Sequence, residues 1–115
     1  MSSASRPIRR RGDPAPIFAA LGDATRLELV SQLSDGQPRS IVQLTSRFRL
    51  TRQAVTKHLD VLERAGIVNR ERVGRESRFS YDPKPIEDVR SYLDAIADQW
   101  DDALSRLKSF VEGGK

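Results

Sequence analysis

The sequence predicts a mainly α-helical chain that contains one small β-hairpin. Three observations support this fold class: apolar residues recur at helical spacing through most of the chain, two Val- and aromatic-containing runs flank Gly74-Arg75, and a long amphipathic segment follows them. At 115 residues the chain has the length of one domain. We place this domain at residues 14–112 and predict a disordered basic tail at residues 1–13.

Composition excludes several classes of protein. The chain has no cysteine, which rules out disulfides and thiolate metal sites. It also lacks a run of about 18 apolar residues, the length needed to span a membrane. No apolar segment follows the basic N-terminal residues to form a signal peptide, so we expect a cytoplasmic protein without a membrane partner.

Basic residues are concentrated in the middle of the chain. Residues 39–78 hold ten Lys or Arg against four Asp or Glu, whereas the residues before them are nearly balanced and those after them are acidic. Such a segment attracts a polyanion such as a nucleic acid, although many basic segments are only solvated surface. Charge alone leaves both interpretations open.

Two short helices are expected at the start of the domain. The first begins near Pro14 and ends at Gly22, a residue type that favours helix C-termini. Asp23 can cap the second helix, which stops at the turn formed by Asp35 and Gly36. The apolar positions of this second helix follow helical spacing: Leu27, Val30 and Leu33.

The next two helices form a predicted helix-turn-helix. Ser40 can cap a short helix that packs Ile41, Leu44 and Phe48, and Thr51 can cap a second helix that continues to Ala65. The second helix is strongly amphipathic. Its expected core side holds Val55, His58, Leu59 and Leu62, and the opposite side holds Gln53, Thr56, Lys57, Asp60 and Arg64, with Arg52 at the boundary.

The polar side of this second helix has the chemistry of a DNA-reading surface. Arg or Lys can donate to guanine O6 and N7, and Gln can pair with adenine. The residues that reach bases lie near the N-terminus of such a helix, where Thr51, Arg52, Gln53 and Thr56 are found. Alternatively, this side simply faces water, but the preceding helix, the basic segment that follows and the scarcity of acids favour DNA binding.

A β-hairpin is expected directly after the helix-turn-helix, over residues 67–73 and 76–81. Gly74 at the first position of a two-residue turn suits the twist of antiparallel strands. Arginines are frequent in this hairpin, and we predict DNA contacts from Arg72, Arg75 and Arg78. A helix-turn-helix followed by such a hairpin is the arrangement of a winged helix.

The final helix is expected from Ile86 to about Val111. Its apolar positions form one stripe along the whole helix, which is more apolar surface than a small domain readily covers. Part of the stripe is expected to pack on the core of the same chain, and the rest on a second copy. The predicted dimer interface consists of Ile17, Phe18, Leu93, Ile96, Trp100, Leu104 and Leu107.

The sequence contains no set of residues that predicts catalysis. His58 is the only histidine, and its spacing places it on the apolar side of its helix without a partner nucleophile. A partly buried, hydrogen-bonded histidine is therefore favoured over a reactive one. Four acids toward the C-terminal end of the chain are expected to be solvated surface rather than a cation site: Asp94, Asp98, Asp101 and Asp102. We predict neither an enzyme nor a bound metal or other cofactor.

The sequence resembles the ArsR family of bacterial winged-helix transcriptional regulators over roughly residues 15–111. The resemblance lies in GDATR at residues 22–26, in QAVTKHLDVLERAGIV at residues 53–68, and in the hairpin glycine. It implies a homodimer built mainly from the first and last helices. It also implies repression at a palindromic operator and release by an inducer.

The resemblance also assigns roles to individual residues. It implies that the wing around Gly74 and Arg75 contacts the DNA backbone or minor groove. It further implies that the recognition helix contacts DNA through Arg52, Gln53, Thr56 and Lys57. A different class of protein, a winged-helix adaptor that binds protein or RNA without reading DNA sequence, remains open.

The sequence differs from the metal-sensing members of that family. Those members carry Cys-x-Cys in the helix before the turn, where this chain has Ser40 and Val42. Other members use His on the last helix, which here has none. The segment 99–107 instead resembles a non-metal subgroup associated with helix-grip ligand-binding proteins. We therefore expect a non-metal-sensing regulator and leave its inducer open.

Overall fold

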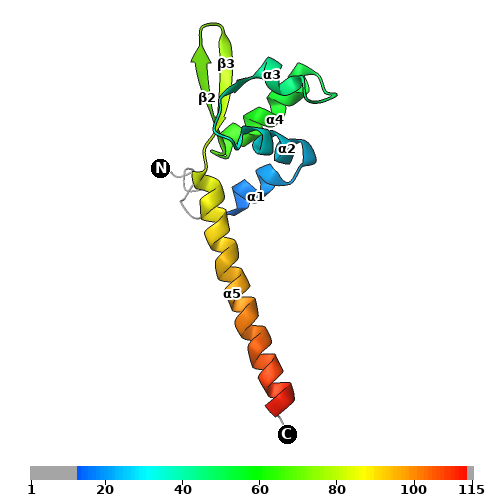
Figure 1. Cartoon of the computed structure of the whole chain (residues 1–115), viewed down its shortest axis with the longest axis vertical. Helices are drawn as coiled ribbons and strands as arrows, with labels where there is room; N and C mark the ends of the chain where they lie inside the picture. The colour runs from blue at the N-terminus through cyan, green and yellow to red at the C-terminus, as the bar shows by residue number, and fades with distance from the viewer. Residues whose placement is uncertain (1–12, 114–115) are drawn as a thin grey trace, which may run out of the picture.

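The computed structural model describes residues 13–113, which form five helices and a three-stranded sheet. The helices are α1 (Ala15–Leu21), α2 (Ala24–Leu33), α3 (Ile41–Thr45), α4 (Arg52–Arg64) and α5 (Lys84–Gly113). The strands are β1 (Arg39–Ser40), β2 (Val68–Val73) and β3 (Glu76–Tyr81). Helices α1 to α4 cluster together, the β2–β3 hairpin projects from them, and α5 extends away on the opposite side (Figure 1). Apart from Asp13, the predicted tail lies outside the described residues.

The helix starts follow the capping residues predicted from the sequence. Asp23 and Thr51 each accept a hydrogen bond from a backbone N–H in the first turn of α2 and α4, at 3.0 Å. Ser40 accepts from the N–H of Gln43, whose side chain accepts from the N–H of Ser40 in return. This reciprocal pair is a capping box, and it explains how a helix as short as α3 begins at a defined residue.

One apolar core joins the four short helices to the base of the hairpin and to the start of α5. Its buried residues are Ile17, Ala20, Leu29, Leu33, Leu44, Val55, Leu59, Leu62, Ile67, Val68, Phe79 and Val89. The predicted apolar side of α2 was wrong in one position, because Leu27 is 52% exposed and Leu29 is buried instead. Leu29 and Leu33 are also one helical turn apart, so spacing alone did not decide between the two alternatives.

The hairpin forms in the predicted register, with β2 beginning one residue late. Val68 pairs with Tyr81 and Val73 with Glu76, so Gly74 and Arg75 form the turn alone. Gly74 has φ of 65°, while Arg75 keeps a negative φ. This combination is that of a two-residue turn with glycine at its first position.

A short strand that the sequence did not predict completes the sheet. In β1, Arg39 and Ser40 pair antiparallel with Phe79 and Arg78 of β3, giving the strand order β1-β3-β2. Two residues are too few to show an alternating pattern. The strand ties the connection between α2 and α3 to the hairpin.

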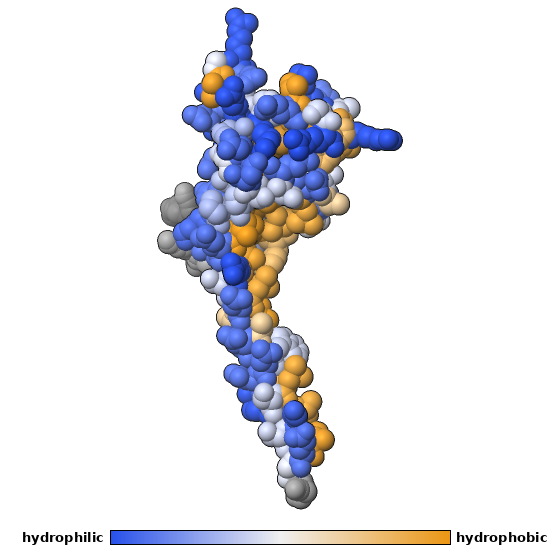
Figure 2. Space-filling view, in the orientation of Figure 1, coloured by the Kyte–Doolittle hydropathy of each residue, from blue (hydrophilic) through white to orange (hydrophobic). Residues whose placement is uncertain are grey.

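Only the first part of α5 packs on the rest of the chain. Val89 is buried, and Tyr92 meets Phe18 of α1 edge-on, with ring centroids 6.3 Å apart. Farther along, the helix leaves the domain, and its exposed apolar side chains are Leu93, Trp100, Leu104, Leu107, Phe110 and Val111. Apolar surface runs along one side of α5 and continues onto the neighbouring part of the domain (Figure 2).

Candidate nucleic-acid interface

The outward side of α4 presents free polar groups to solvent. Arg52, Gln53 and Lys57 are exposed, and within residues 13–113 their side chains have no hydrogen-bond or ion-pair partner. Together with Thr56 they line an open depression on the surface. The opposite side of the helix is fully buried through Val55, Leu59 and Leu62. The amphipathic pattern predicted for this helix is therefore confirmed.

The two threonines of this region already serve the helix itself. Thr51 is the N-cap, and the hydroxyl of Thr56 donates to the carbonyl of Arg52 at 2.8 Å. Thr56 therefore has a methyl group and an acceptor oxygen left for an external ligand, but not its donor. The free donors of this surface belong to Arg52, Gln53 and Lys57.

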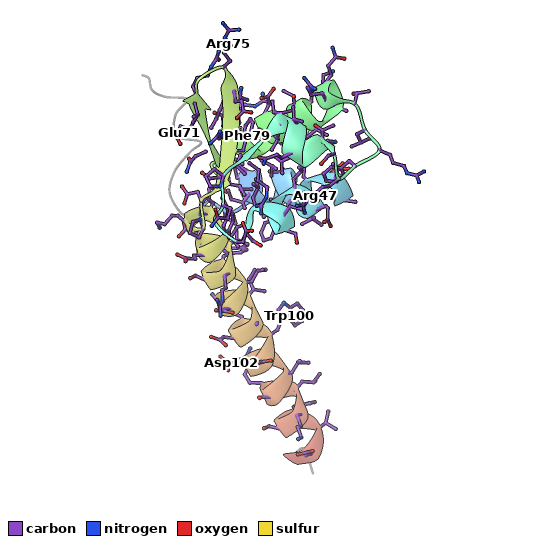
Figure 3. The ribbon with its side chains drawn as sticks, turned by 45° about the horizontal axis from the view of Figure 1, so that its top comes forward. Arg47, Glu71, Arg75, Phe79, Trp100 and Asp102 are labelled. Carbon is purple, nitrogen blue, oxygen red and sulfur yellow. The ribbon has the colours of Figure 1, made fainter. Side chains whose placement is uncertain are left out.

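The structure separates the wing arginines named as DNA contacts. Arg72 stands opposite Ser77, whereas Arg78 stands opposite Glu71. Since successive residues of a strand point to opposite sides, these pairs place Arg72 and Arg78 on different faces of the hairpin. Arg75 projects from the turn, away from the rest of the domain (Figure 3). The eight predicted residues therefore form a cluster on α4 and a dispersed set on the wing.

The wing arginines also differ in how far their charge is balanced. The Nε of Arg78 lies 3.0 Å from a carboxylate oxygen of Glu76, so this cation is partly neutralised. Among the residues that the structure describes, Arg72 donates only to the carbonyl of Gly74, at 3.5 Å. Within the described part of the chain, Arg75 has no polar partner. Arg75 and Arg72 are consequently the wing cations most available to a phosphate.

Arg70, which no sequence pattern distinguished from the other wing arginines, pairs with α4. Its guanidinium contacts carboxylate oxygens of Asp60 and Glu63 and lies over the ring of Phe79. Asp60 and Glu63 are three residues apart, a spacing that puts both on neighbouring turns of one helix side. Which strand residue meets them depends on how the hairpin packs, so the sequence carried no local signal for this contact.

His58 lies on the inner side of α4 and is hydrogen-bonded to α2. Its side chain is 24% exposed, and its Nδ1 lies 3.1 Å from Nη1 of Arg26. The same guanidinium donates to the carbonyls of Ala19 and Ala20 at the end of α1. The prediction of a partly buried, hydrogen-bonded histidine is confirmed.

Two carboxyl groups form hydrogen bonds at the two ends of α2: Asp23 caps its start, and Asp35 lies in the connection from α2 to β1. The backbone N–H of Arg26 holds the pKa of the Asp23 carboxyl below its usual value. The guanidinium of Arg39 and the backbone N–H of Gln37 keep the pKa of Asp35 well below its usual value. Both groups are therefore ionised at neutral pH and keep their hydrogen bonds there.

The residues at the positions of the family's Cys-x-Cys do not fit a metal ion. Ser40 is buried, and its hydroxyl oxygen accepts the capping hydrogen bond of α3. Val42 has no atom that could bind a metal. Elsewhere in residues 13–113, no three His, Cys, Asp or Glu side chains are grouped as metal ligands. None of the helices within residues 13–113 combines the length and apolar character needed to cross a membrane.

Known proteins with similar sequences are transcriptional regulators. Residues 21–71 match a family model described as a helix-turn-helix domain. The chain is 36% identical over 84 residues to the HTH-type transcriptional regulator YuzN of Bacillus subtilis, covering 68% of this chain and 91% of that protein. It is 31% identical over 88 residues to the HTH-type transcriptional repressor SmtB of Mycobacterium tuberculosis, covering 76% of this chain and 63% of SmtB.

Similar solved structures carry the same architecture. An ArsR-like transcriptional regulator from Rhodococcus sp. RHA1 has a TM-score of 0.73 and 35% identity, covering 84% of this chain and 91% of that one. A second ArsR family transcriptional regulator has a TM-score of 0.70 and 28% identity, covering 76% of this chain and 94% of that one. The helix-turn-helix, the wing and these relatives together show that the chain belongs to the ArsR family of winged helix-turn-helix transcriptional regulators, which are DNA-binding proteins and not enzymes.

Proposed function

We propose that the chain is a repressor that binds a palindromic operator as a homodimer, with α4 of each protomer in the major groove. The observation that carries this proposal is the free donor surface of α4. Arg52, Gln53 and Lys57 have no partner within the described chain, whereas Asp60 and Glu63 of the same helix do. Unpaired donors beside an open depression suit base edges and phosphates.

The position of each group along α4 suggests its role. Arg52 and Gln53 stand in the first turn, where a recognition helix reaches base edges, so we assign base reading to them. Lys57 lies one turn farther on, and we assign it a phosphate contact. Thr51 and Thr56 add contacts through the helix N-terminus and a methyl group, and Arg75 and Arg72 of the wing bind backbone phosphates. Arg78, which faces the other side of the hairpin, is assigned a weaker, accessory contact.

The proposed dimer interface uses the uncovered part of α5. Trp100, Leu104 and Leu107 are between 57% and 64% exposed in the single chain, which is unusual for side chains of this size. A second copy presents the same stripe, so an isologous contact covers both at once. The contact continues through Leu93 and Ile96 to Phe18. Ile17 is buried in the core of its own chain and is not part of the proposed interface.

We further propose that the regulator belongs to the non-metal-sensing branch and answers to an inducer other than a metal ion. Ser40 and Val42 lack the ligand atoms that a Cys-x-Cys pair supplies to a soft metal. A non-metal inducer would act by changing the spacing of the two α4 helices, since the operator accepts them only at one separation.

Selection of bound duplexes from a random pool, combined with sedimentation of the purified protein, tests the proposal. We expect a recovered palindrome with half-sites about one helical turn apart. We also expect a dimer in solution and an affinity that falls steeply with salt. A winged-helix adaptor would instead bind all duplexes weakly and alike, and recovery of no dyad would favour that alternative. Repression is then read from a reporter placed behind the recovered site.

A further inference from the structure

One guanidinium connects the wing to the recognition helix. Nη2 of Arg70 lies 2.5 Å from Oδ1 of Asp60 and 3.1 Å from Oε1 of Glu63. Its Cζ lies 4.9 Å from the centre of the Phe79 ring. Arg70 thus has two ionic contacts to α4 and one aromatic contact within the hairpin.

The surroundings of this contact make it a geometric restraint. Arg70 and Phe79 are register partners on β2 and β3, and Phe79 is fully buried in the core between the hairpin and the helices (Figure 3). The Arg70 side chain itself is 34% exposed. A planar guanidinium that stacks on a fixed ring and bridges two carboxylates has little freedom to turn. The contact therefore restrains the angle between the hairpin and α4 in addition to the apolar core that they share.

The same contact changes the charge of the DNA-facing side of α4. Asp60 follows Gln53 by seven residues, or about two helical turns, and so lies on the side of Gln53 and Lys57. An unpaired carboxylate there would repel the DNA backbone. Pairing with Arg70 offsets that repulsion without adding a cation that reaches out to DNA.

We propose that Arg70 is a positioning residue for DNA recognition, which holds the wing at the angle where wing and α4 engage one duplex together, and that it does not itself contact DNA. This role depends on the proposed DNA-binding function, because Arg70 would act only through the residues of the wing and α4 that contact DNA. Arg72 provides the contrast, because it lies two residues farther along the same face and has no carboxylate partner among the described residues.

A direct phosphate contact by Arg70 is the competing interpretation, and the two make opposite predictions for the acids. Asp60→Asn combined with Glu63→Gln raises the charge of α4 by two. If Arg70 binds phosphate, this variant frees it and strengthens binding to every duplex. If Arg70 positions the wing, the variant loses discrimination between the operator and a scrambled duplex, even though its charge has become more favourable.

The experiment measures affinities for the selected operator and for a scrambled duplex of equal length by fluorescence anisotropy, over a series of salt concentrations. The variants are Arg70→Gln, Arg70→Lys, the double variant D60N/E63Q and the control Arg72→Gln. We expect each of the first three to lower the ratio of operator to scrambled affinity about threefold or more, with the salt slope of Arg70→Gln unchanged. Arg70→Lys is included because it keeps the charge and loses the planar guanidinium that lies over the Phe79 ring.

The control is expected to behave differently. Arg72→Gln should weaken both duplexes alike and reduce the salt slope by about 0.9, the value for one lost phosphate contact. Combining Arg70→Gln with D60N/E63Q should lower the ratio of operator to scrambled affinity little further than either variant alone, since all three residues form one contact. Thermal unfolding followed by circular dichroism verifies that each variant is folded. D60N/E63Q, which keeps Arg70 over Phe79, serves as the test if Arg70→Gln does not fold.

Three results distinguish a failure of the positioning role from a failure of the proposed function. An Arg70→Gln variant that loses salt slope like Arg72→Gln and keeps its discrimination would overturn the positioning role while leaving the proposed function intact. The same holds if D60N/E63Q strengthens binding to both duplexes equally. A wild-type protein that does not distinguish the operator from the scrambled duplex would overturn the proposed function first.

Discussion

Arg26 donates a hydrogen bond to Nδ1 of His58 across 3.1 Å and so joins α2 to the inner side of the recognition helix. Because arginine has no acceptor, Nδ1 of His58 must accept this hydrogen bond. The remaining donors of Arg26 reach the carbonyls of Ala19 and Ala20. A single side chain therefore satisfies the open end of α1 and supports α4 at the same time.

Removal of this side chain is expected to weaken the fold. We predict that Arg26→Ala lowers the free energy of unfolding by roughly 1–3 kcal/mol, because part-buried acceptors on α1 and α4 lose their donor. Arg26→Lys keeps the charge but not the fork and should recover only part of the loss. Urea denaturation of both variants measures the difference. An Arg26→Ala midpoint equal to that of the wild type would contradict the prediction.

Two substitutions on α4 are expected to have different signatures. Gln53→Ala should cost roughly 1–3 kcal/mol of binding free energy on one operator sequence, because it removes a base-reading amide. Lys57→Ala should weaken all duplexes about equally, because it removes a phosphate contact. Affinity measurements on the selected site and on single-base variants of it test both assignments. Unchanged operator affinity for both variants would refute the role of this surface.

The wing turn depends on Gly74, and its replacement should affect DNA binding. With φ of 65° at Gly74, an added Cβ costs roughly 1 kcal/mol or more and displaces the tip that carries Arg75. Gly36→Ala is the matched control, since Gly36 has φ of 85° in the connection between α2 and β1. We expect a similar loss of stability for both and a loss of operator affinity only for Gly74→Ala. Equal operator affinities of Gly74→Ala and Gly36→Ala would show that the wing tip makes no contact with DNA.

The single tryptophan provides a direct measure of the proposed dimer. Trp100 is 64% exposed in one chain, so its fluorescence should shift to shorter wavelength as protein concentration rises and a second α5 covers it. Leu104→Glu should abolish this shift and the sedimenting dimer, because it buries an unpaired charge in the interface. Asp98→Asn, also on α5, is the control expected to change neither. The interface is excluded if the unsubstituted protein sediments as a monomer and its fluorescence spectrum does not change with concentration.

The ion pair of Asp35 and Arg39 should make part of the stability depend on pH. The pKa of Asp35 is lower in the folded chain than its unfolded value of about 3.9, so its contribution is present above that value. The contribution is lost as the pH falls through the folded pKa. We expect Asp35→Asn to reduce the melting temperature at pH 7 and to flatten its decline below about pH 4. Asp98→Asn should leave the decline unchanged; an equal effect of both would contradict the assignment.

Local sequence features determined most of the helix-turn-helix and the wing turn. The caps at Asp23, Ser40 and Thr51 and the turn at Gly74 each depend on neighbours within a few residues, and all of them formed as predicted. The two sides of α4 follow from a period of 3.6 residues, which is also a local property. For the same reason the composition of the candidate DNA surface could be predicted, while its contacts with DNA stay a prediction.

Only the tertiary structure decided which of several compatible local patterns is used. It buried Leu29 rather than Leu27, paired Arg39 and Ser40 with β3, and kept Ile17 inside its own chain. It also divided wing arginines that look alike in sequence: Arg70 pairs with α4, whereas Arg75 has no polar partner within residues 13–113. Each of these outcomes depends on a partner distant in the chain. Local periodicity and propensity do not encode such partners, because the choice of partner is set by how whole elements pack against one another.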